Sequence, residues 1–69
     1  MTFRIEVEQE EDGRWIAEIS EILGAMVYGQ SREDAVSRVE ALALRVLAER
    51  IEHGETFPLI DKVFSVAVA

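Results

Sequence analysis

Two runs of alternating apolar and polar residues, 2–10 and 14–20, most limit the folds open to this chain. Apart from Ile16, both runs carry their apolar side chains at odd positions, and this two-residue period predicts two half-buried strands. The three residues between them end in Gly13, and a three-residue turn with Gly last is a common hairpin connection. This turn pairs Val7 with Ala17 and keeps the apolar positions of both strands on one face. The sequence therefore predicts a β-hairpin in this register.

The same register places acidic side chains on the other face of the hairpin. Glu6 falls directly opposite Glu18, and like charges that face each other across a strand pair destabilise it. Glu8 and Glu10 extend this acidic strip, with Ile16 among them. We interpret the five residues as a docking site for a basic surface. A solvated outer face without a partner is the alternative, and the residues alone leave both open.

A short third strand is predicted at residues 25–28, followed by a helix. Ser31 is a candidate N-cap, because its hydroxyl can accept a hydrogen bond from a free backbone N–H of the first turn. Asp34, three residues later, is an acidic variant of the capping box and suits the helix dipole. Gly54 is a typical C-terminal stop. We therefore expect a helix over residues 32–53.

The helix carries an apolar stripe that is wider than one sheet face requires. Residues at i, i+3, i+4 and i+7 spacing form its centre, and they are Ala35, Val36, Val39, Leu42, Ala43, Val46, Leu47 and Ile51. Leu44 lies beside them. The final run, 62–68, is apolar or small on both sides, as in a strand that is covered on both faces. We expect Leu44, Phe64 and Val66 to face a second subunit.

These elements predict one α+β domain over residues 1–69, in the order β-β-β-α-β. We expect one mainly antiparallel sheet with one long helix on one face. A long helix between the third and last strands permits a parallel return. The predicted strand order is 3-2-1-4, with the last strand parallel to the first.

Composition limits the classes of function. With no Cys and one His among 69 residues, the chain has no disulfide or thiolate zinc site, and we expect no metal and no cofactor. A domain of this size buries only about 60% of its unfolded surface. Association is the remaining way to gain stability. We predict a homodimer or tetramer.

The net charge of −7 is concentrated in residues 1–30, which hold seven Asp or Glu against two Arg. Such a surface repels nucleic acid, because phosphate contacts need Lys and Arg, and attracts a basic protein. Solubility alone is the alternative. The first residues lack the pattern of a secretory signal, and no apolar run approaches the roughly 18 residues of a membrane span. We expect a cytoplasmic protein without direct contact to nucleic acid or membrane.

A spaced set of residues runs through the whole chain: Asp12-Gly13-x-Trp15-x-Ala17-x-Ile19, then Gly24, then Gly29-x-Ser31-x-Glu33-x-Ala35, and near the end Gly54-Glu55-x-x-Pro58. This combination resembles the HicB-like antitoxin family. Two positions depart from the family pattern. Leu23 stands where Pro is usual, and Gln30 where an acidic residue often precedes the helix cap.

The resemblance implies a truncated ribonuclease H-like fold and a binding role. HicB-like domains bind HicA toxins, small basic proteins that cut mRNA, and cover the toxin's RNA-binding surface and catalytic His. The acidic strip would then dock such a toxin. Many HicB-type antitoxins also carry a C-terminal DNA-binding module. We expect none here, since Ala69 directly follows the last predicted strand.

We predict that the chain is not an enzyme. Metal-dependent nucleases of the implied fold need carboxylates clustered at the first strand, the helix and the last strand. The first strand offers Glu6 and Glu8, and the last offers only Asp61 at its entrance. Glu40 and Glu49 of the helix share no evident centre with them. His53 suits a capping role at the helix end, and the alternation places Trp15 in the core. A self-associating structural or regulatory domain without a toxin, and a nuclease remnant, are the alternative classes.

Overall fold

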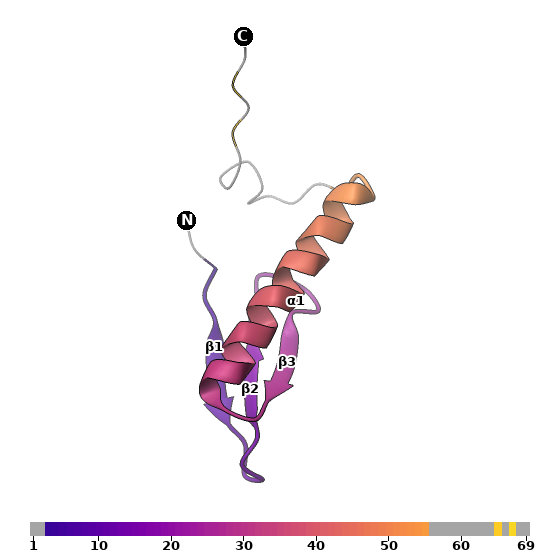
Figure 1. The fold of residues 1–69 in the computed structure, drawn as a ribbon. Coiled ribbons are helices and arrows are strands. Elements are labelled where there is room, and N and C mark those ends of the chain that lie inside the picture. Colours follow the sequence, from indigo (N-terminus) through magenta and orange to yellow (C-terminus); the bar gives the residue numbers. More distant parts are fainter. Residues whose placement is uncertain (1–2, 56–64, 66, 68–69) are drawn as a thin grey trace.

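The computed structural model describes residues 3–55, 65 and 67. These residues form three strands and a helix, β1 (Glu6–Gln9), β2 (Trp15–Glu18), β3 (Met26–Gly29) and α1 (Arg32–Glu52). The strands make one antiparallel sheet in the order β1-β2-β3. The helix α1 lies across one face of this sheet (Figure 1). The predicted α+β fold with an antiparallel sheet and one long helix is confirmed.

The predicted fourth strand, residues 62–68, lies largely outside the described residues. Ser65 and Ala67 are described; neither is in a strand, and both are exposed. The described sheet therefore supports neither a fourth strand beside β1 nor the predicted order 3-2-1-4. Phe64 and Val66 also lie outside the described residues.

The hairpin of β1 and β2 has the predicted register. Val7 lies opposite Ala17, and at the turn the N–H of Glu10 donates to the carbonyl oxygen of Arg14 at 2.7 Å. Gly13 closes the turn with φ of 93°, a left-handed conformation that a side chain disfavours. The three-residue turn and the alternation of apolar residues thus select the same pairing.

The helix begins and ends at the predicted signals. Ser31 Oγ accepts a hydrogen bond from the N–H of Asp34 at 3.0 Å, and the Asp34 carboxylate accepts one from the N–H of Gln30 at 2.9 Å. These bonds satisfy donors around the helix start that would otherwise lack partners. At the other end, the N–H of His53 bonds back into the last turn, and Gly54 has φ of 75°. His53 is therefore the C-cap.

The core lies between the sheet and α1. Its buried side chains in the described part of the chain are Ala17, Ile19, Ile22, Ala25, Ala35, Val39, Ala43 and Leu47. Trp15 packs against them, as predicted. The predicted place of Ile51 in the stripe is wrong, since its side chain is 48% exposed. The 21-residue helix is roughly 31 Å long, whereas the four-residue strands are about 13 Å long, so its last turns extend past the sheet.

The start of α1 approaches β3 most closely at Gly29. A Cβ on this glycine would lie 2.7 Å from the Cα of Ala35 and still nearer to the Ala35 nitrogen. A larger residue at this position would push the backbone of β3 away from the backbone of α1 at Ala35. The glycine thus positions the first helical turn on the sheet.

Candidate functional site

The face of the sheet opposite α1 carries most of the acidic strip. Glu6 lies directly opposite Glu18, and Glu8 lies opposite Ile16. All three carboxylates are exposed, while Ile16 is half-buried. Together with Val7, these four residues line a hollow of about 150 Å³. The structure therefore brings four of the five predicted site residues together, and we call their hollow the acidic hollow.

Glu10, the fifth predicted residue, belongs to the end of the hairpin. It lines another hollow, of about 440 Å³, with Glu11, Asp12, Arg14 and Tyr28. Its backbone N–H bonds to the carbonyl oxygen of Arg14, so Glu10 continues the register of the hairpin up to the turn. The predicted strip is thus divided between two hollows.

The hairpin end also holds a cation whose role sequence reasoning missed. The Arg14 guanidinium lies 4.3 Å from the centre of the Tyr28 ring, a cation–π contact. Its Nε donates to Asp12 Oδ2 at 2.7 Å. The backbone N–H of Arg14 donates to Asp12 Oδ1 at 3.1 Å, and this bond is the main cause that lowers the pKa of Asp12. The third strand is too short for alternation alone to show that Tyr28 faces Arg14.

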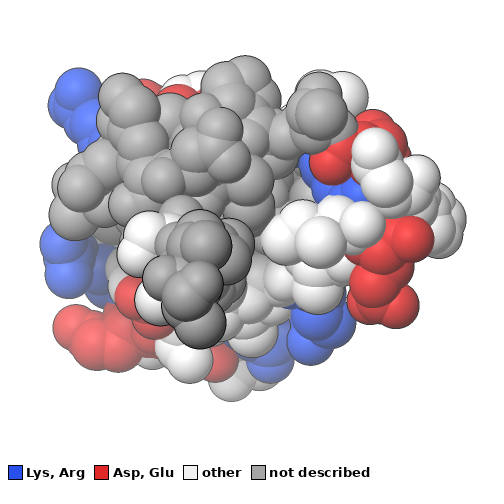
Figure 2. All heavy atoms as spheres, turned by 90° about the horizontal axis from the view of Figure 1, so that it is seen from above, with Lys and Arg blue, Asp and Glu red and all other residues white. Residues whose placement is uncertain are grey.

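The acidic hollow has a single sign of charge. Three of its lining residues are Glu and none is Lys or Arg, so it concentrates negative potential. The end of the molecule at which α1 terminates differs, because acidic and basic side chains both appear around its rim (Figure 2). A cationic group fits the acidic hollow, and Ile16 offers an apolar contact for the aliphatic stem of a Lys or Arg.

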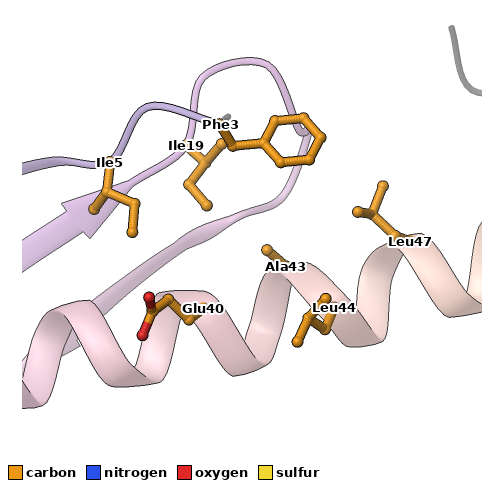
Figure 3. Close-up of a pocket in the computed structure, with 7 residues that line it drawn as sticks. All are labelled: Phe3, Ile5, Ile19, Glu40, Ala43, Leu44 and Leu47. Carbon is orange, nitrogen blue, oxygen red and sulfur yellow. The ribbon is translucent and has the colours of Figure 1, made fainter. Parts of the chain in front are cut away.

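An apolar hollow of about 430 Å³ lies on the helix side of the sheet. Its lining residues are Phe3, Ile5, Ile19, Glu40, Ala43, Leu44 and Leu47, with Phe3 and Ile19 drawn opposite the helix residues in Figure 3. Leu44, predicted to face a second subunit, lies at this hollow and is 69% exposed. Glu40 lines the same hollow and is therefore separated by the sheet from Glu6.

Among residues 3–55, 65 and 67, the His, Cys, Asp and Glu side chains form no group of three or more that could hold a metal ion. Within this part of the chain, no helix combines the length and the apolar character that crossing a membrane requires.

No protein-family model, curated protein or solved structure matches this chain. The function proposed below therefore depends on the geometry of the site and on the sequence pattern.

Proposed function

We propose that this chain is a HicB-like, antitoxin-type protein that binds a small basic RNA-cleaving toxin of the HicA kind. The observation that carries the proposal is the acidic hollow formed by Glu6, Glu8 and Glu18 around Ile16. Glu6 and Glu18 face each other across the β1–β2 pair, which costs stability. A Lys or Thr at either position would avoid this cost and keep the face soluble. A basic partner supplies a reason to retain both carboxylates.

The proposed mechanism is occlusion. Carboxylates of the acidic hollow attract cationic side chains of the toxin, which speeds association. The toxin needs the same kind of side chain to hold RNA phosphates, so the antitoxin and RNA compete for one surface. This chain performs no chemical step, uses no cofactor, and contacts neither nucleic acid nor a membrane directly. Both proteins meet in the cytoplasm.

We also propose that residues 62–68 form a fourth strand beside β1 and parallel to it. Their alternation of Phe64, Val66 and Val68 with smaller residues supports a strand. The helix ends at the side of the sheet where β1 begins (Figure 1), so a chain returning along β1 would run in the same direction. The strand order would then be 3-2-1-4.

A self-associating structural or regulatory domain without a toxin is the second candidate. The exposure of Leu44 beside the apolar hollow favours it. The interface would include Leu44, Phe64 and Val66, and the assembly would be a homodimer or tetramer. A gene for a small basic protein with one His, next to the gene for this chain, favours the antitoxin over this candidate.

The decisive experiment compares two triple variants with the unchanged chain as bait in the native host. One variant changes Glu6, Glu8 and Glu18 to Lys. The control changes three exposed helix residues, Glu40, Glu49 and Glu52, to Lys and alters the net charge equally. We expect a small basic protein to be captured by the unchanged chain and by the control, and to be lost with the first variant.

A second measurement tests whether the captured protein is a toxin. The purified partner should cut RNA, and one equivalent of this chain should stop the cutting. Equal capture by both triple variants would show that the acidic hollow is not the docking site. A captured protein without RNA-cleaving activity would contradict the antitoxin function itself.

A further inference from the structure

The strand β3 lies at one edge of the sheet that the described residues form. The N–H of Ile19 donates to the carbonyl oxygen of Ala25 at 2.9 Å, just before the ladder of β2 and β3 begins. Hydrogen-bonded positions alternate along an antiparallel pair. Ala25, Val27 and Gly29 therefore direct their backbone groups to β2. Met26 and Tyr28 direct theirs away from it, along the outer edge.

The edge formed by β3 differs in charge from the opposite edge of the sheet. Residues 26–29 are Met, Val, Tyr and Gly, without a charge or a proline. Proteins commonly protect an edge strand with charged side chains or proline, and β3 has neither. β1 carries Glu6 and Glu8 along its length. The strand β3 thus offers an edge whose own residues carry no charge that would repel an added strand.

Apolar side chains flank this edge on both faces of the sheet. On the outer face, Met26 is 53% exposed and Tyr28 is 41% exposed. On the helix side, Val27 lines a hollow of about 320 Å³ with Ala41 and Leu42, and Ser37, Arg38 and Arg45 complete its lining. A strand added to β3 would cover the apolar groups on both faces.

We propose that two copies of this chain pair through β3 in antiparallel orientation, about a two-fold axis at Val27, so that their two sheets become one continuous sheet. Met26 then lies opposite the partner's Tyr28, and by symmetry Tyr28 lies opposite the partner's Met26. Both residues direct backbone groups to the edge, so this register makes four hydrogen bonds between the copies. It also places a Met sulfur beside an aromatic ring, which is favourable.

A second copy fits this edge for reasons of charge and size. The chain carries a net charge of −7, so its copies repel each other except where a neutral surface allows approach. Pairing through β1 would bring Glu6 and Glu8 of one copy close to the acids of the other. A domain of 69 residues also gains from burying more apolar surface. This pairing is independent of the toxin and leaves the acidic hollow on β1 and β2 free.

The register can be tested by cross-linking, because the chain has no natural Cys. Position 27 faces itself across the axis as a pair without mutual hydrogen bonds, with Cα atoms about 4.5 Å apart. That separation is within the range of a disulfide. We expect the variant Val27→Cys to form a covalent dimer under mild oxidation, whereas Glu52→Cys, at the exposed end of α1, remains single. No dimer at position 27, or equal yields at both positions, would overturn the pairing.

A second variant tests the hydrogen bonds of the edge. Met26→Pro removes an N–H that points away from β2, and proline is tolerated at such an edge position. In sedimentation experiments, the mass should fall from that of two chains to that of one, with the circular dichroism spectrum unchanged. Glu52→Ala, at the exposed end of α1, should leave the mass at two chains. The proposal is contradicted if Met26→Pro folds and is still a dimer, or if the unchanged chain is monomeric at all concentrations. If Met26→Pro does not fold, the cross-link at position 27 decides.

Discussion

Glu6 lies directly opposite Glu18 in the β1–β2 pair, with both carboxylates exposed on the face of the sheet away from α1. The turn at Gly13 and the apolar alternation select the register that creates this pair. A register shifted by one residue would move apolar side chains out of the core. The repulsion is therefore a consequence of the hairpin, and only a change of residue can remove it.

Replacing one member of this pair should stabilise the fold. Glu18→Lys converts the repulsion into an attraction, and we expect the free energy of unfolding to rise by about 0.5 kcal/mol in urea titrations. Glu21→Lys, in an exposed loop, makes the same change in net charge and serves as control. The difference between the two variants should shrink in 1 M salt, where the screening length is about 3 Å. Equal effects of both substitutions would attribute the gain to net charge alone.

Removing the N-cap should destabilise the helix start. Ser31→Ala deletes the hydroxyl that accepts from the N–H of Asp34, and we expect a loss of about 1 kcal/mol of unfolding free energy. Ser37→Ala, on the exposed side of the same helix, should be neutral or raise stability by about 0.5 kcal/mol, because Ala has the higher helix propensity. Thermal unfolding followed by circular dichroism measures both. A similar loss in both variants would argue against the cap.

Two glycines should respond differently to an added methyl group. Gly29→Ala forces the new Cβ against the backbone of Ala35, and we expect a loss of about 3 kcal/mol or failure to fold. Gly54→Ala meets no atom within 4 Å and suffers only from its φ of 75°. Its expected cost is about 1 kcal/mol. Chemical denaturation of the two variants tests the order, and a milder effect at Gly29 would contradict the close approach of α1 and β3.

The stability of the fold should depend on the charge of Asp34. The N–H of Gln30 is the main cause that holds the pKa of this carboxyl below its ordinary value of 3.8, and the Arg38 guanidinium adds to it. The folded state therefore prefers the carboxylate. Its contribution is complete above the unfolded pKa and is lost as the pH falls through the folded pKa. The advantage of the unchanged chain over Asp34→Asn should be constant above about pH 5 and shrink in acid. An advantage that does not change with pH would assign the effect to shape rather than charge.

Sequence patterns predict this fold best where the interaction is local. The register of the hairpin depends on Gly13 and on side chains a few residues away, and the helix bounds depend on Ser31 and Gly54. Each of these signals acts within one turn of the chain. For this reason the structure confirms two predictions, the N-cap at Ser31 and the pairing of Val7 with Ala17.

The same locality explains which members of the candidate site were placed well. Glu6, Glu8, Ile16 and Glu18 share a face because strand alternation and register suffice to bring them together. Glu10 differs only because it lines the neighbouring hollow at the end of the hairpin.

Contacts between distant elements decided the remaining features. Ile22 lies in a loop, yet it is only 1% exposed because the loop packs its side chain into the core between the sheet and α1. Ile51 continues the apolar stripe of the helix, yet it is exposed because α1 is longer than the strands. The contact of Arg14 with Tyr28 likewise required the pairing of β2 with β3.

Within residues 3–55, α1 covers one side of the sheet and leaves the other open, with negative charge at β1 and β2 and uncharged residues along β3. Local periodicity dictates which side chains point to that side. Whether they gather there depends on how far each strand and the helix extend, a property of the packed molecule that no short segment encodes.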